Sequence, residues 1–261
     1  MIWSVNINVA DIRAEPKFRS ERISQALFNE TVRVEEEKDG YSRVICGNDG
    51  YEGWIASQFI SEHDGFPKDN TYRVTANLAS GYAAPGTDSG RVASLPYGCY
   101  LYGEVDGDFI RLATGRYGEI FVSLSQATKY GFPEKPSLPD RDELVVEAEK
   151  FLGAPYLWGG RSFFGIDCSG FVQTVARRFG MELPRDTKDQ IDAGTEIKRG
   201  QVRHGDLLFF PRHVVMAVSN SGFIHSSSTN GGVAYNSVDS NNKLFNEYYY
   251  KEFKTARRIF E

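Results

Sequence analysis

One cysteine in the C-terminal half of the chain has the surroundings of a nucleophile. Cys168 stands in the run Asp167-Cys168-Ser169-Gly170-Phe171, ahead of an apolar pattern typical of a helix. Asp167 suits the N-cap of that helix, which puts Cys168 in the first turn. Unpaired backbone N–H groups and the helix dipole favour a thiolate there, below the usual thiol pKa of about 8.5. A free cysteine is more often a buried apolar residue, but the polar neighbours of Cys168 argue against that role. Cys46 and Cys99 lack such neighbours and are interpreted as structural.

Two histidines in the same half could supply the base for such a nucleophile. Of the four histidines, His63 and His204 fall at an expected domain junction and an expected turn. His213 and His225 instead fall in two successive apolar segments that are typical of strands. A single strand histidine is more often a packed core residue. Two of them in one domain with a candidate thiolate suggest a nucleophile, a base and a group that orients the base.

The two histidines can act together only if they lie on one face of the sheet. A four-residue loop that paired Val218 directly with Phe223 would put them on opposite faces. The loop sequence Ser219-Asn220-Ser221-Gly222 tolerates turn conformations. We therefore predict a three-residue loop with a glycine bulge between the two strands.

Other chemistries fit the sequence less well. Zinc ligands usually come in close pairs, whereas Cys168, His213 and His225 are widely spaced along the chain, with no obvious fourth ligand. There is no phosphate-binding loop and no glycine-rich dinucleotide motif after a strand. A net charge of −5 and a pI near 5.5 argue against a nucleic-acid partner. We therefore expect no metal and no cofactor.

The segments around these residues predict helices followed by strands. A first helix is expected to begin at Asp140, with Glu143 completing a capping box, and to end at Gly153 and Pro155. Its expected apolar face comprises Leu144, Val145, Ala148, Phe151 and Leu152. A second helix is expected over 168–179, with Phe171, Val172, Val175 and Phe179 inward and Gly180 as its stop. Strands are expected at 206–210, 213–218, 223–226, 233–238 and 257–260, which together with the helices indicate an α+β domain.

The N-terminal half, up to about position 130, is typical of short strands in small barrels, with a weak internal repeat. Asp39-Gly40 and Asp106-Gly107 are separated by about the length of one small barrel, and each is followed by an alternating strand, a second turn and another strand. A cluster of prolines, Pro133, Pro136 and Pro139, then predicts an extended linker.

The C-terminal motifs resemble those of the NlpC-type papain-like peptidases. The matching segments are 155–160 (Pro-Tyr-Leu-Trp-Gly-Gly), 167–171, 183–185 (Leu-Pro-Arg) and 205–210, together with His213 and His225. The resemblance covers the chain from about position 131 to its end. It implies that Cys168 attacks the substrate, that His213 is the general base and that His225 orients His213. It also implies that Tyr156 lies near the oxyanion, with the backbone N–H of Cys168 as a second donor.

The N-terminal half resembles bacterial SH3-like domains. Segments 10–16 and 50–54 carry the resemblance in the first copy, whereas the second copy lacks the tryptophan and the arginine-containing loop. We therefore expect SH3-like domains at 1–66 and, in divergent form, at 67–130, followed by a peptidase domain at 131–261. The expected fold class is α+β, with a papain-like NlpC catalytic domain preceded by two small SH3-like β-barrels.

The whole chain is similar to YkfC-type enzymes, which are γ-D-glutamyl-L-diamino acid endopeptidases. The resemblance implies hydrolysis of the bond between γ-D-glutamate and diaminopimelate or lysine in muropeptides that have a free N-terminal L-alanine. The first barrel would close one end of the groove. Glu15, with Tyr51, Asp167 and Ser169, would bind the free amine. Alternatively, Glu15 is a solvated loop charge and Tyr51 a barrel packing residue.

The expected partners are peptidoglycan-derived peptides, and the protein is expected to be a monomer. No apolar window approaches the roughly 20 residues of a membrane span, and the first residues do not have the pattern of a signal peptide. We therefore expect a cytoplasmic enzyme of murein peptide recycling, or a secreted or periplasmic one if a leader was removed. The sequence leaves two other functions open, an N-acetylmuramoyl-L-alanine amidase and a wall-binding module with an inactive peptidase domain.

Overall fold

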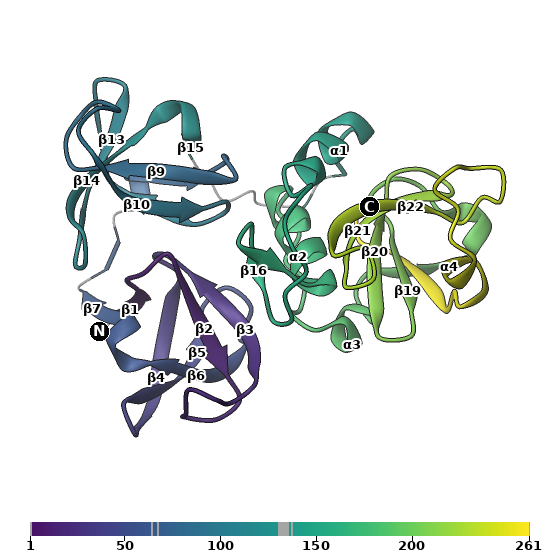
Figure 1. Ribbon diagram of the computed structural model, residues 1–261, viewed down its shortest axis with the longest axis horizontal. Helices are drawn as coiled ribbons and strands as arrows, with labels where there is room; N and C mark the ends of the chain where they lie inside the picture. Colours follow the sequence, from purple (N-terminus) through teal and green to yellow (C-terminus); the bar gives the residue numbers. More distant parts are fainter. Residues whose placement is uncertain (1, 64, 67, 130–135, 137, 261) are drawn as a thin grey trace. The chain divides into compact units, whose positions relative to one another are not determined.

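The chain folds into two compact units in a computed structural model (Figure 1). The structure describes all residues except 1, 64, 67, 130–135, 137 and 261. The units are Met1–Gly131 and Phe132–Glu261. Most of the expected proline linker lies outside the described residues.

The first unit begins with seven antiparallel strands. They are β1 (Ile2–Val5), β2 (Val9–Arg13), β3 (Arg22–Leu27), β4 (Thr31–Lys38), β5 (Tyr41–Cys46), β6 (Glu52–Ala56) and β7 (Ile60–His63), with the 3-10 turn η1 (Ser57–Phe59) before β7. Their order in the sheet is β3-β2-β6-β5-β4-β1-β7. Alternate residues of β5 are buried, as expected of a strand with one face on a core. The predicted tight turn is present between β4 and β5, where Asp39 and Gly40 have φ values of 51° and 78°.

The second half of this unit repeats the same strand order. Its elements are η2 (Lys68–Asn70), β8 (Thr71–Val74), β9 (Leu78–Tyr82), β10 (Arg91–Pro96), β11 (Tyr100–Tyr102), β12 (Glu104–Asp106), β13 (Phe109–Thr114), β14 (Gly118–Ser123), η3 (Leu124–Gln126) and β15 (Ala127–Lys129). The sheets run β10-β9-β14-β13-β12 and β11-β8-β15, so one long strand, the counterpart of β4, is split at Gly103. The first side-chain carbon of any other residue at this position would lie 2.3 Å from the Arg111 carbonyl oxygen. The close approach of the two backbones at position 103 therefore requires a glycine.

The two halves of the first unit share buried contacts. Leu27 and Phe28 from the first strand set are buried in the apolar cluster of the second, which includes Leu101 and Val122. Asn29 also donates from Nδ2 to the Tyr100 carbonyl oxygen at 3.0 Å. The two strand sets therefore share contacts, although the first set also has an apolar cluster of its own.

The second unit packs helices against a six-stranded antiparallel sheet. The helices are α1 (Arg141–Glu149), α2 (Cys168–Arg178), α3 (Thr187–Gln190) and α4 (Glu247–Lys251), with η4 (Arg199–Gln201). The sheet has the order β18-β23-β19-β20-β21-β22 and comprises β18 (Thr195–Ile197), β19 (Leu207–Phe210), β20 (His213–Ala217), β21 (Gly222–Ser227), β22 (Gly232–Ser237) and β23 (Thr255–Arg258). A small hairpin of β16 (Arg161–Ser162) and β17 (Gly165–Ile166) precedes α2. Helix α2 packs on β20 and β21, and α1 contacts α2 (Figure 1).

Most of the predicted elements of this unit are confirmed, with two corrections in α1. Helix α2 spans nearly the predicted range, and Gly180 has a φ of 80° just after it. The capping box at Asp140 is not formed, since its side chain accepts no cap hydrogen bond. The helix also ends at Glu149, which leaves Leu152 41% exposed instead of on the buried face. Short elements such as β18 and α4 were not predicted, because their length gives no clear period.

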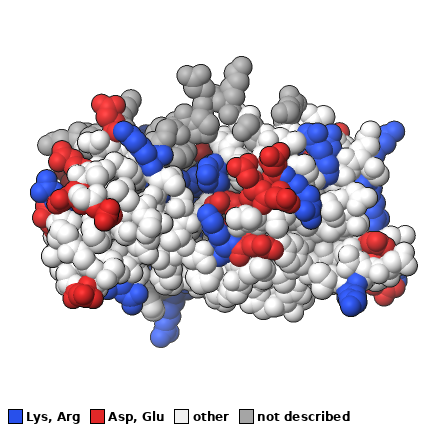
Figure 2. Space-filling model, turned by 90° about the horizontal axis from the view of Figure 1, so that it is seen from above, with Lys and Arg blue, Asp and Glu red and all other residues white. Residues whose placement is uncertain are grey.

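On the face of the molecule that Figure 2 shows, acidic and basic side chains are interspersed. Among the described residues, no helix is long and apolar enough to cross a membrane. All three cysteines are free and buried.

Candidate active site

The hairpin of β20 and β21 brings the two candidate histidines together. Ala217 pairs with Phe223, and the Val218 N–H donates to the Gly222 carbonyl oxygen at 2.9 Å, which leaves a loop of three residues. His213 and His225 therefore share one face, with Nε2 of His213 2.7 Å from Nδ1 of His225. The predicted odd loop length is confirmed. The predicted glycine bulge is wrong, because the pairing has no register shift and Gly222 does not have a positive φ.

A third polar side chain continues this line of contacts. Oδ1 of Asn236, on β22, lies 2.9 Å from Nε2 of His225. Asn236 pairs with Phe223 across the ladder while His225 pairs with Ala234, so Asn236 and His225 are diagonal neighbours on one face. Asn236 was not predicted from the sequence. The only signal there is a polar residue on the strand that follows the second histidine.

An aromatic ring from α4 covers the histidine pair. The Tyr249 ring stacks on His213, with centroids 5.6 Å apart and an angle of 28°, and meets His225 edge-on at 5.2 Å. Asn246 caps α4 by accepting from the Tyr248 and Tyr249 N–H groups, which fixes the position of the ring. Sequence reasoning missed Tyr249, since the helix that carries it is barely more than one turn long.

Cys168 begins α2, as predicted, and lies beside the start of β20. Asp167 is the N-cap and accepts from the Gly170 N–H at 2.7 Å. The backbone of Val214 hydrogen-bonds the Cys168 thiol, and Thr187 Oγ1 lies 3.7 Å from its sulfur. Val214 directly follows His213, so the thiol is hydrogen-bonded to the strand residue next to the first of the two histidines.

The ionisation of these groups differs from the expectation of a preformed thiolate. Burial raises the pKa of the Cys168 thiol, and the Asp167 carboxylate raises it further. The hydrogen bonds from Val214, Thr187 and the Ser169 backbone lower it by less. Burial also lowers the pKa of His213 to about 3, with a further contribution from His225, and that of His225 to about 4. At neutral pH the site therefore holds a thiol and two neutral imidazoles.

Asp167 and Ser169 form a buried network with an arginine. Arg185 donates from Nη2 to Oδ2 of Asp167 at 2.7 Å and from Nη1 to Oδ1 at 3.0 Å, and Nη1 also donates to the Ser169 hydroxyl at 2.8 Å. The Ser169 hydroxyl and the Gly159 N–H also donate to Asp167, at 3.2 and 2.9 Å. Asp167 and Ser169 are each 5% exposed. The network holds the start of α2 in place, and Arg185 is the arginine of the Leu-Pro-Arg motif.

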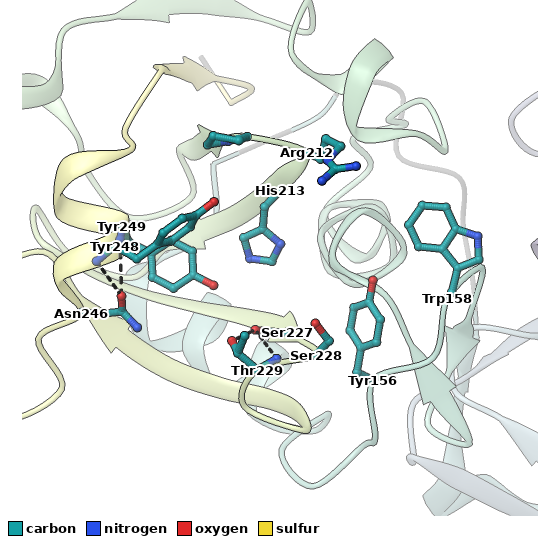
Figure 3. Close-up of a pocket in the computed structure, with 11 residues that line it drawn as sticks. Tyr156, Trp158, Arg212, His213, Ser227, Ser228, Thr229, Asn246, Tyr248 and Tyr249 are labelled. Atoms are coloured by element: carbon teal, nitrogen blue, oxygen red, sulfur yellow. Dashed lines mark hydrogen bonds between the residues drawn. The ribbon is translucent and has the colours of Figure 1, made fainter.

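A cavity of about 480 Å³ opens beside the histidine pair (Figure 3). Its lining includes Tyr156, Trp158, Arg212, His213 and Tyr249. Burial, with the nearby Cys168 and Asp167, raises the pKa of Tyr156 to about 12, so its hydroxyl stays protonated at neutral pH and can donate a hydrogen bond. Trp158, which is 59% exposed, adds an aromatic side chain to this lining.

The two remaining candidate residues belong to the first unit. The Glu15 side chain is 60% exposed and pairs with Lys17 at 2.5 Å. Tyr51 is half-buried and packs against the apolar cluster of the first strand set. In the part of the chain that the structure describes, no group of three or more His, Cys, Asp or Glu side chains could hold a metal ion.

Comparison with known protein families matches both halves of the chain. Residues 153–258 match the NlpC/P60 family, and residues 12–60 match the bacterial dipeptidyl-peptidase SH3 domain. "Probable endopeptidase NlpC" of Escherichia coli K12 is 40% identical over 121 residues, which cover 43% of this chain and 74% of that protein. The fold, the site and these matches define the class of the protein. It is a cysteine peptidase with an N-terminal SH3-like domain.

More particularly, the chain belongs to the NlpC/P60 family. The γ-D-glutamyl-L-lysine dipeptidyl-peptidase of Bacillus subtilis strain 168 is 29% identical over 252 residues, covering 91% of this chain and 81% of that protein. The crystal structure of an NlpC/P60 family protein from Bacillus cereus ATCC 10987 has the same fold over the full length of both chains. Its TM-score is 0.87 at 21% identity.

Proposed function

We propose that the protein hydrolyses the bond between γ-D-glutamate and the diamino acid in peptidoglycan-derived peptides that have a free N-terminal L-alanine. The observation that carries the proposal is the 2.7 Å contact between His213, which lines the cavity, and His225, together with the hydrogen bond from the Val214 backbone to the Cys168 thiol. Relatives named γ-D-glutamyl-L-lysine dipeptidyl-peptidase, which match most of this chain, support the choice of substrate.

In the proposed mechanism Cys168 is the nucleophile and His213 the base. The thiol proton passes to His213 as the sulfur attacks the γ-carbonyl carbon, and the carbonyl π electrons move to its oxygen. The Cys168 backbone N–H and the Tyr156 hydroxyl donate to this oxyanion. When the intermediate collapses, the C–N bond breaks and protonated His213 gives its proton to the leaving amine. Water, deprotonated by His213, then hydrolyses the thioester and restores the thiol.

The same proposal assigns the recognition of the substrate's free amine to Glu15, Tyr51, Asp167 and Ser169. The exposure of the Glu15 carboxylate supports its assignment to the amine, because a substrate could reach it. Its ion-pair partner Lys17 is also exposed. The oxygens of Asp167 accept several hydrogen bonds already, so its charge would act on an ammonium group from within the Arg185 network.

We also propose that the first unit is a pair of SH3-like barrels. Loops 14–20 and 83–89 support this, because they close in the same way. The Glu15 N–H donates to the Ser20 hydroxyl at 2.8 Å, and the Ala84 N–H donates to the Ser89 hydroxyl at 3.2 Å. In this assignment the domains are 1–66, 67–130 and an α+β peptidase domain at 131–261. A monomeric enzyme of cytoplasmic murein peptide recycling completes the proposal.

Mass spectrometry of products from defined peptides tests the proposal. Incubation with L-Ala-γ-D-Glu-L-Lys and with its diaminopimelate counterpart should release the dipeptide L-Ala-D-Glu and the free diamino acid. N-acetylated versions of the same peptides should be cleaved far more slowly. Cleavage between muramic acid and alanine in a muropeptide, with both tripeptides left intact, would identify an amidase instead.

A further inference from the structure

We propose that Asn236 is a positioning residue that makes Nδ1 of His213 the atom that accepts the thiol proton. The inference rests on the proposed function in one respect, since it takes His213 to be the base. Three consecutive hydrogen bonds, which end on the Leu244 carbonyl, carry the argument.

The orientation of the Asn236 amide is fixed at both ends. Its Nδ2 donates to the Leu244 carbonyl oxygen at 3.4 Å, and its Oδ1 accepts from Nδ2 of Asn230 at 2.9 Å. Turning the amide over would set its oxygen against the Leu244 carbonyl oxygen, and two acceptors cannot bond each other. Oδ1 therefore faces His225.

This orientation determines the tautomer of His225. An amide oxygen only accepts hydrogen bonds, so Nε2 of His225, 2.9 Å away, carries the ring proton. Nδ2 of Asn230 also lies near this Nε2, but at 3.4 Å, so the shorter 2.9 Å contact with the Asn236 oxygen decides which nitrogen carries the proton. His225 is fully buried, and burial lowers its pKa to about 4, so the ring is neutral at neutral pH. A neutral ring with its proton on Nε2 has a lone pair on Nδ1.

The tautomer of His225 in turn determines that of His213. Nε2 of His213 lies 2.7 Å from Nδ1 of His225, which has the lone pair. Nε2 of His213 must therefore carry a proton and donate it to this hydrogen bond. Neutral His213 then has its own lone pair on Nδ1. When the Cys168 S–H bond breaks, the new N–H bond forms at Nδ1 and the electron pair left on sulfur forms the bond to carbon.

Without the Asn236 oxygen, the tautomers of the two histidines would no longer be fixed. His225 could then hold its proton on Nδ1 and donate it to Nε2 of His213, which would put the His213 proton on Nδ1 and occupy the basic site. In a serine protease the wrong histidine tautomer lowers kcat by about 10⁴-fold. We expect Asn236→Ala to lower kcat by about 10²- to 10⁴-fold and to change KM by less than about threefold.

Two matched variants separate this role from a structural one. Asn236→Asp keeps an acceptor at the same place, so kcat should stay within about tenfold of wild type. The ionisable groups in ring contact with the histidine pair are the two histidines themselves and Tyr249. A new carboxylate should therefore raise the pKa of the pair and shift the acid limb of kcat to higher pH. Asn241→Ala, at an exposed loop position, should leave kcat unchanged.

Nitrogen-15 NMR of the imidazoles tests the assignment without reference to activity. The chain has four histidines, so His213→Ala and His225→Ala variants suffice to assign the signals of the pair. Both rings should show an unprotonated Nδ1 and a protonated Nε2, and Asn236→Ala should abolish this pattern.

Three results would each overturn the inference. They are a protonated Nδ1 on His213 in the wild-type protein, a wild-type kcat in Asn236→Ala, and an unshifted acid limb of kcat in Asn236→Asp. If Asn236→Ala does not fold, the wild-type spectrum and the Asn236→Asp profile decide. Absence of cleavage by the wild-type protein would refute only the proposed function.

Discussion

At the scale of single residues, the site is a thiol and two imidazoles whose charges are set by burial. Cys168 is 6% exposed and His225 is fully buried, so an ion pair between thiolate and imidazolium would cost more here than in water. The start of α2 supplies backbone donors, but these lower the thiol pKa by less than burial raises it. In the proposed mechanism, proton transfer should therefore accompany attack on the substrate and not precede it.

This charge state predicts a distinctive pH dependence. A group whose pKa falls to about 3 stays unprotonated above about pH 4, so neutral His213 is available across the neutral range. We expect kcat/KM to show no fall near pH 6.5, where an ordinary histidine would titrate. We also expect no thiolate absorbance between pH 5 and pH 8 in the difference spectrum of wild type against Cys168→Ser. A thiolate signal in that range would contradict the neutral pair.

The residues of the site differ in how far sequence could find them. Cys168, His213 and His225 could be selected because each has a chemical type and a local pattern that point to a role. Asn236 and Tyr249 could not, because their roles depend on the register of β22 and on the placement of a one-turn helix. Long-range register and short elements leave no periodic signal in a single sequence.

At the scale of elements, the position of Cys168 depends on a close approach of backbone at the start of α2. A side chain added at Gly170 would lie 2.4 Å from the Gly160 carbonyl oxygen. The same stretch holds Asp167, whose hydrogen bonds tie the helix start to Arg185 and to Gly159. The glycine at position 170 is therefore explained by this close packing.

Gly170→Ala should consequently disturb both stability and activity. We expect a loss of about 1–3 kcal/mol in the free energy of unfolding, because the carbonyl that meets the new methyl group belongs to the backbone. We expect kcat to fall at least about tenfold, as α2 and Cys168 shift. Chemical denaturation and steady-state kinetics measure the two effects. Gly200→Ala is the control, since nothing lies within 4 Å of the added atom there. Equal effects of the two substitutions would contradict the claim that close packing at Gly170 positions Cys168.

Elements with strong periodicity were predicted well, whereas their ends were not. Helix α2 and strands β19 to β23 follow the expected segments. Helix α1 ends earlier than expected because Lys150 to Gly153 leave the helix, and no side-chain cap holds its start. Helix ends depend on a few hydrogen bonds whose formation the apolar pattern does not determine.

At the scale of the whole molecule, the proposal gives the N-terminal unit a part in substrate choice. The two strand sets of that unit have the same order and the same hydroxyl-closed loop, yet only the first has a carboxylate, Glu15, where the second has Ala84. The repeat was weak in sequence because its shared features are turns and hydrogen bonds rather than residue identities.

Glu15→Ala should weaken the preference for a free amine about 10- to 100-fold, since a charge-assisted hydrogen bond contributes about 1.5–3 kcal/mol. The measurement is the ratio of kcat/KM for L-Ala-γ-D-Glu-L-Lys and its N-acetylated form. Glu37→Ala, another exposed carboxylate of the same unit, is the control and should not change the ratio. An unchanged ratio in Glu15→Ala would remove Glu15 from the proposed amine site.

The central claim is that the Cys168 sulfur, paired with His213, attacks the substrate. Acid quenching during turnover of L-Ala-γ-D-Glu-L-Lys, followed by mass spectrometry of peptides, tests it most directly. We predict an L-Ala-γ-D-Glu thioester on the peptide that contains Cys168, and no such adduct and no hydrolysis in Cys168→Ala. Normal hydrolysis by Cys168→Ala, or an adduct on any other residue, would contradict the claim.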